Sequence, residues 1–139
     1  MNGESTRIPS RGGAAARVAG AALGLALAGG PLLAQAPGGG GAAAIAAMKG
    51  DLRAIVSANE VYHAHHATYA KSVDSLPGFH THPGVSITFV SVADHGWSAK
   101  ATGASAPGKS CVIYVGAVPP PKTEQGLSGP EAVATCDKP

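Results

Sequence analysis

The sequence predicts a small α+β domain in which an N-terminal amphipathic helix packs on a small antiparallel sheet of about three to four strands. Apolar residues recur at three- and four-residue steps before residue 66 and alternate with polar residues after residue 84. Two cysteines, Cys111 and Cys136, bracket a C-terminal tail with little periodicity. The chain has 139 residues, 13% of them charged, with 20 Gly and 11 Pro, which suits one small domain with non-globular additions.

The charge distribution argues against nucleic acid as a partner. The chain has ten Lys and Arg against eight Asp and Glu, but three of these cations and one of these anions lie in residues 1–36. Residues 37–139 therefore carry equal numbers of both signs, without the clustered basic face that nucleic acid requires. The chain is also too short for the large enzyme folds.

The first 36 residues are predicted to be a secretory signal peptide. An arginine-containing polar stretch precedes the small apolar residues Val18 to Ala28, and Ala34-Gln35-Ala36 has the pattern of a cleavage site. We therefore expect a periplasmic or extracellular protein, which contacts a membrane only through this peptide if it stays uncleaved. Pro37 disfavours cleavage directly before it, which leaves earlier cleavage or none as alternatives.

The only two cysteines, Cys111 and Cys136, are predicted to form a disulfide, because they are even in number and the predicted destination is oxidising. The bond would staple the C-terminal tail to the domain and stabilise the fold by roughly 3 kcal/mol in the chain-entropy model. The sequence has no Cys-x-x-Cys motif, so it does not indicate a redox dithiol, a haem attachment site or a thiolate zinc site.

A glycine-rich linker, residues 37–41, precedes the predicted domain, residues 42–139. From Ala42 to about His65 the apolar side chains share one face of a helix. This stripe comprises Ile45, Met48, Leu52, Ile55, Val56 and Tyr62, and it also collects Asn59, His63 and His66. Val61 and His65 are expected to point away from the stripe.

Residues 67–84 contain two Pro-Gly pairs and are predicted to form a loop. Alternating apolar residues then predict strands over residues 85–89 and 97–102, joined through an Asp-His-Gly turn. A third strand, residues 110–115, is apolar on both faces and is expected to be the most covered. Three consecutive prolines after this strand begin the extended tail.

Several short segments follow one another in the order of a known family. They are Asp51-Leu52-Arg53, Asn59-Glu60-Val61-Tyr62, Thr68-Tyr69, Pro83-Gly84-Val85, Gly96-Trp97-Ser98-Ala99-Lys100-Ala101 and Gly108-Lys109-Ser110-Cys111-Val112-Ile113-Tyr114-Val115-Gly116. Over residues 42–137 this order resembles the globular part of type IV pilin-like proteins and pseudopilins. The resemblance implies a helix packed on an antiparallel sheet, with a C-terminal segment closed by a disulfide.

One feature of that family is not matched. Its members carry a prepilin leader and then about 20 apolar residues, with a Glu at the fifth position, which serve as a membrane anchor. Here the apolar stretch after Gly41 ends at Met48, and Ala46 stands at the fifth position. We therefore expect a pilin-like soluble domain exported by an ordinary signal peptide, instead of a subunit that assembles through a buried N-terminal helix.

Residues 103–110, Gly-Ala-Ser-Ala-Pro-Gly-Lys-Ser, match the G-x-x-x-x-G-K-[ST] phosphate loop. Such a loop binds phosphate because a helix follows it and presents its N-terminal N–H groups. A strand is predicted to follow here, so we predict a turn between strands and no nucleotide site.

Six histidines are many for so small a domain, and imidazole is a common metal ligand. His63 and His66 lie one turn apart on the helix, and His80 and His82 would share one face of an extended segment. These four residues give the alternative interpretation, a periplasmic metal-binding protein that holds zinc or copper. The preferred interpretation has no cofactor, with His63 packed under the sheet and His65 in solvent.

No catalytic residues are predicted, because the sequence has neither a G-x-S-x-G elbow nor an H-E-x-x-H motif. Four carboxylates are separated and expected to be solvated: Asp51, Glu60, Asp74 and Asp94. We therefore predict a non-enzymatic module of the cell envelope that acts through its surface. The expected partners are envelope, pilus or secretion proteins, or a second copy of the chain, contacted through loops 70–84 and 117–135.

Overall fold

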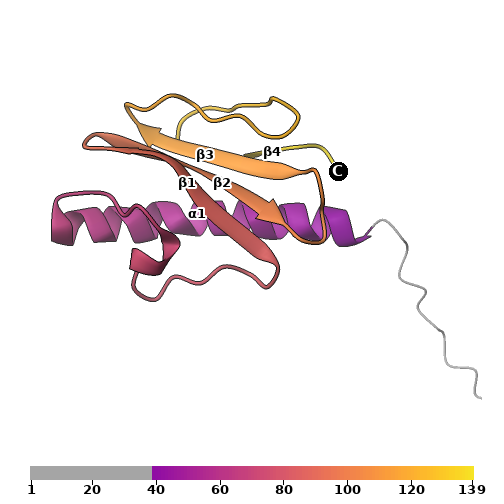
Figure 1. Cartoon of the computed structure of the whole chain (residues 1–139), viewed down its shortest axis with the longest axis horizontal. Helices are drawn as coiled ribbons and strands as arrows, with labels where there is room; N and C mark the ends of the chain where they lie inside the picture. The colour runs from indigo at the N-terminus through magenta and orange to yellow at the C-terminus, as the bar shows by residue number, and fades with distance from the viewer. Residues whose placement is uncertain (1–38) are drawn as a thin grey trace, which may run out of the picture. The chain divides into compact units, whose positions relative to one another are not determined.

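Residues 39–139 build one helix and one antiparallel sheet, as the sequence predicts (Figure 1). The computed structural model describes these residues, and the predicted signal peptide lies outside them. The elements follow in the order α1 (Gly39–His66), the short 3-10 helix η1 (Val73–Ser75), β1 (Val85–Ala93), β2 (Gly96–Gly103), β3 (Ser110–Gly116) and β4 (Thr135–Cys136). Neighbouring strands are antiparallel and lie in the order β1-β2-β3-β4, which makes the sheet a meander.

The helix α1 begins at Gly39, before the predicted start at Ala42. The last three glycines of the predicted linker are therefore helical. Each residue added to an existing helix closes one further hydrogen bond, and this offsets the roughly 1 kcal/mol that glycine costs relative to alanine. The alanine-rich stretch that follows, residues 42–47, provides the helix that the glycines extend.

The buried face of α1 is the predicted apolar stripe. Met48, Leu52 and Ile55 are fully buried, and each such side chain contributes on the order of 1.5–3 kcal/mol. The same core cluster contains alternate residues of β2: Trp97, Ala99 and Ala101. Apart from Trp97, these β2 residues are small, and a Cβ at Gly103 would make an ordinary van der Waals contact with Sδ of Met48 at 3.5 Å. Two helix residues predicted to point away from the stripe are exposed: Val61 and His65.

The C-terminal segment covers the outer face of the sheet, which is the face turned away from α1. Ser98 of β2 and Val112 of β3 point to this face and are buried. Glu124 of the segment pairs with Lys100 at 2.5 Å, and its backbone N–H donates to Oγ of Ser110 at 2.8 Å. Both central strands are therefore covered on two faces. The prediction that residues 110–115 form the most covered strand is wrong, because β2 is buried along most of its length while the last residues of β3 are only partly buried.

A close contact between two glycines joins the start of β2 to the end of β3. Gly96 lies opposite Gly116 in the strand register. A Cβ on Gly96 would lie 2.5 Å from the carbonyl oxygen of Val115, and one on Gly116, whose φ is +77°, would overlap the carbonyl oxygen of His95. Any side chain at either position would push the two strands apart.

Cys111 and Cys136 form the predicted disulfide. The two residues lie directly opposite each other in the pairing of β3 with β4, with their Cα atoms 4.0 Å apart. A strand of two residues has too few ladder hydrogen bonds to stay attached on its own. The covalent bond therefore fixes the tail, and the N–H of Asp137 extends the pairing by donating to the carbonyl of Ser110 at 3.0 Å.

The double substitution C111A/C136A is expected to lower the free energy of unfolding by about 3 kcal/mol, because the bond closes a loop with a sequence separation of 25. Urea titration of the two oxidised proteins, followed by the fluorescence of Trp97, measures this difference. A reducing agent should destabilise the wild type and leave the variant unchanged. Equal midpoints before and after reduction of the wild type would show that the bond adds nothing.

Candidate functional site

The first of the two loops predicted as interaction surfaces is fixed to the core by a buried carboxylate. Oδ2 of Asp51, on α1, accepts a hydrogen bond from the backbone N–H of His82 at 2.8 Å, and Oδ1 lies 2.5 Å from Nδ1 of the same residue. The Asp51 side chain is 4% exposed, so the prediction that it is solvated is wrong. Asp51 borders the apolar stripe, and the loop covers it while supplying the donors that a buried carboxylate needs.

The start of the same loop is held by a second polar side chain of α1. Asn59 is fully buried, and its Oδ1 accepts a hydrogen bond from the backbone N–H of Ala70 at 2.8 Å. Between Ala70 and His82, the side chain of Leu76 is buried in the core and Val73 packs against it. The loop backbone is therefore tied at both ends and held by apolar side chains between them.

Aromatic rings and histidines lie together at the C-terminal end of α1. His63 stacks on Tyr69 with ring centroids 4.3 Å apart, and His66 stacks on Tyr62 at 4.1 Å. His63 therefore packs against the loop instead of under the sheet, because Tyr69 covers this end of the helix. Burial and the nearby Glu60 carboxylate raise the pKa of the Tyr69 hydroxyl above its usual value.

The substitution D51A is expected to lower the free energy of unfolding by about 1–3 kcal/mol, because it removes the charged acceptor of the partly buried hydrogen bond from the N–H of His82. Amide hydrogen exchange should accelerate most in residues 79–84. A control is D94A, which removes an exposed carboxylate from the turn between β1 and β2. Equal effects of the two substitutions on stability and exchange would contradict the role assigned to Asp51.

The second loop, residues 117–135, is fixed by Asp137, which directly follows the disulfide. Asp137 is 2% exposed. Its Oδ2 accepts hydrogen bonds from the N–H and the hydroxyl of Ser110 at 2.8 and 3.3 Å, and its Oδ1 accepts one from the N–H of Gln125 at 3.0 Å. Oγ of Ser110 accepts the N–H of Glu124 in turn. One carboxylate and one hydroxyl therefore hold the backbone of β3 and of the loop together.

The later part of this loop returns to the end of β3. The N–H of Gly116 donates to Oε1 of Glu131 at 2.6 Å, and the N–H of Ala132 donates to the carbonyl of Tyr114 at 2.8 Å. Leu127 and Val133 remain 38% and 47% exposed. The loop therefore has a fixed course and offers two apolar side chains to a partner.

The surroundings of Asp137 also change its affinity for protons. Burial raises its pKa, but hydrogen bonds from the Thr123 side chain, from Ser110 and from the backbone of Gln125 outweigh this, so the pKa lies below its usual value. The folded protein thus binds this proton less readily than the unfolded chain does. The stabilising effect is complete above the unfolded pKa of about 3.9 and is lost as the pH falls through the folded-state pKa.

The substitution D137N is expected to lower the free energy of unfolding at neutral pH. It should also make this free energy fall less steeply in acid, because Asn keeps the shape of the side chain without the titrating charge. Urea unfolding at a series of pH values between about 6 and 2 measures both effects. The control D74N removes an exposed carboxylate and should keep the wild-type pH dependence. If the free energy of unfolding falls equally steeply with decreasing pH in D137N and in the wild type, Asp137 is not the group responsible for the loss of stability in acid.

The structure does not bring the four histidines of the alternative metal site together. Within residues 39–139, no group of three or more His, Cys, Asp or Glu side chains is arranged to hold a metal ion. His63 and His66 stack on tyrosines, His82 pairs with Asp51, and His80 is exposed. The zinc or copper interpretation gains no support from this geometry.

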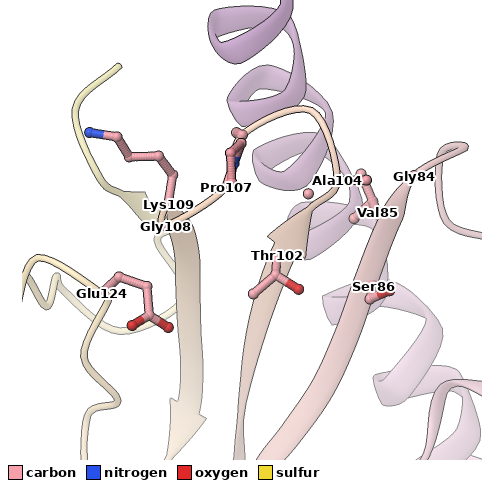
Figure 2. Close-up of a pocket in the computed structure, with 11 residues that line it drawn as sticks. Gly84, Val85, Ser86, Thr102, Ala104, Pro107, Gly108, Lys109 and Glu124 are labelled. Carbon is pink, nitrogen blue, oxygen red and sulfur yellow. The ribbon is translucent and has the colours of Figure 1, made fainter.

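The segment that matches a phosphate loop connects β2 to β3, as predicted. It borders a hollow of about 640 Å³ whose other walls include residues 84–86, Thr102 and Glu124 (Figure 2). The N–H groups of Ala106 and Lys109 donate to carbonyls within the segment, and Figure 2 shows the Lys109 side chain directed away from Thr102. Because a strand follows, the segment lacks the helix N-terminus on which phosphate binding depends.

Sequence reasoning missed the roles of Asp51 and Asp137. Asp51 borders an apolar stripe and Asp137 adjoins a cysteine, and a carboxylate in either place needs hydrogen-bond donors once it is buried. Asn59 gave the clearer signal, since it lies within the stripe itself. None of these positions identifies its partner, which comes from a distant part of the chain.

No protein-family model matches the chain, and no curated protein sequence matches it. Among residues 39–139 there is no helix that combines the length and the apolar character needed to cross a bilayer. The inference of function therefore rests on the geometry of the two fixed loops.

Proposed function

We propose that the chain is an exported, non-enzymatic interaction module, similar to the globular domain of type IV pilins and pseudopilins. In this proposal it binds envelope, pilus or secretion proteins through loops 70–84 and 117–135. The observation that carries the proposal is that a buried carboxylate ties each loop to the core, Asp51 in one case and Asp137 in the other.

Fixed loops favour binding because a flexible loop loses conformational entropy when a partner orders it. Here the backbone of both loops is already ordered by the fold, while many of their side chains face solvent. The first loop offers Lys71 and Asp74, and the second offers Leu127 and Val133. A partner would therefore meet a preformed surface with charged and apolar groups.

Two further observations support export and the resemblance. A disulfide persists in an oxidising compartment, and the Cys111–Cys136 bond therefore favours a periplasmic or extracellular location. The helix packed on an antiparallel sheet, with its C-terminal segment closed by that bond, has the layout that the resemblance implies.

The loop surfaces are tested with a photo-crosslinking amino acid placed at Asp74 or at Leu127 in the cells that produce the protein. Both positions should give discrete cross-linked products, whereas the same probe at Ala54, on the exposed side of α1, should not. D51A should reduce the product from position 74 and leave that from position 127, because it loosens only the first loop. Equal labelling from Ala54 would overturn the assignment to the loops.

Export is tested separately by blocking free thiols in intact cells before lysis and then measuring the mass of the protein. The expected species lacks the signal peptide and carries no blocking group, because Cys111 and Cys136 are already joined. A full-length chain with both thiols blocked would contradict export.

A further inference from the structure

The outward edge of β1 is the longest stretch of unpaired strand in the sheet that the structure describes. β1 has nine residues, lies at the end of the strand order and pairs on one side only, with β2. Its sequence, Val-Ser-Ile-Thr-Phe-Val-Ser-Val-Ala, has no charge and no proline. Edge strands are protected by charged residues, proline, short length, β-bulges or a covering loop; this strand has a register shift after Phe89 but neither charge, proline nor short length.

Two hydrogen bonds define which backbone groups of β1 face β2. The carbonyl of Gly84 accepts from the N–H of Ala104 at 2.8 Å, just before the strand and in line with its pairing to β2. The N–H of Val85 instead donates to the carbonyl of His82 at 3.0 Å, away from β2. Antiparallel pairing alternates along a strand, so every second residue after Val85 also directs its backbone groups outward.

This alternation places the N–H and C=O groups of Ile87 and Phe89 on the free edge. No other segment of residues 39–139 forms a backbone hydrogen bond with them. Ser86 and Thr88 flank Ile87, with exposed side chains on the outer face of the sheet. The edge therefore offers unpaired backbone groups, with hydroxyl side chains on one face and apolar side chains on the other.

A groove of about 360 Å³ runs along this part of the edge. One wall is formed by residues 85–89 and the other by residues 71–74 and Thr81. Val73 packs into the core below the sheet, so this stretch of the loop borders the edge without pairing to it. An extended chain at the usual strand spacing of about 4.8 Å would satisfy the unpaired backbone groups.

The charges around the groove favour an uncharged occupant. Lys71 and Asp74 lie on the same wall and balance each other. The edge itself carries no charge. When a strand pairs antiparallel with a second copy of itself, identical residues lie near each other across a two-fold axis, so any charged residue would face a residue of the same charge. Residues 85–89 contain no charged residue, so two copies of this segment can pair without charge repulsion. The segment also has the alternation of apolar and hydroxyl residues that the edge presents.

We propose that β1 pairs with β1 of a second copy of the chain, antiparallel and through residues 85–89, so that one sheet continues across two molecules. The register shift between Phe89 and Ser91 ends the regular pairing, which limits the contact to a short segment. The association is therefore weak and depends on concentration. This inference goes beyond the proposed function, because it uses the sheet edge and neither of the two fixed loops.

The test uses the full chain recovered from an exporting host and measures self-association by sedimentation velocity over a range of concentrations. The variant S86K places a cation beside the proposed contact at an exposed position, and Thr88 is left unchanged because it lies opposite Lys100 of β2 within the same molecule. It should weaken self-association about tenfold or more, since like charges oppose each other across paired strands. The control A54K adds the same charge on the exposed side of α1 and should behave as the wild type.

Mixing S86K with S86E should restore association between the two variants, because opposite charges then lie near each other across the paired strands. In the wild type, amide exchange at Ile87 and Phe89 should slow as the concentration rises, a measurement that needs no variant. The proposal is overturned if the wild type stays monomeric up to about 1 mM, a range that covers weak complexes. It is also overturned if the control is weakened equally or if the mixed variants fail to associate.

Discussion

The packing of α1 against β2 is the contact on which the rest of the structure depends. A helix with one apolar face and a sheet of short strands are each marginal in water, and burying the two faces against each other removes both from solvent. Trp97 provides the largest buried side chain, and the small side chains of Ala99 and Ala101 belong to the same core cluster as the buried residues of the helix. The two loops and the C-terminal strand are then attached to a core that already exists.

Both loops are attached to the core in the same way, through a buried carboxylate that accepts hydrogen bonds from the main chain. Asp51 and Asp137 both bond backbone N–H groups of distant segments, and neither is paired with Lys or Arg. Backbone groups are the same whatever side chains a loop carries. The course of each loop is therefore held largely independently of the side chains that face solvent, which leaves those side chains available for recognition.

The parts of this fold that can be predicted from sequence are those with a local signal. The helix stripe and the strand alternation each appear within a short window of the chain, and the two cysteines are predictable because each has only the other to pair with; the structure contains all three. The burial of Asp51 depends on His82, 31 residues later, and that of Asp137 on Ser110, 27 residues earlier. Spacing along the chain carries no trace of such pairs. The start of α1 at Gly39 has a local cause, the alanine-rich helix that directly follows the glycines.

The disulfide also decides how the domain transmits tension. A pull on the C-terminus passes from Cys136 through the bond to Cys111 and then back along the chain towards β2 and α1. Residues 112–135 lie outside this covalent path and are spared the load. A domain tethered at its two ends would therefore keep the second loop in its folded course under forces that disturb other parts of the sheet.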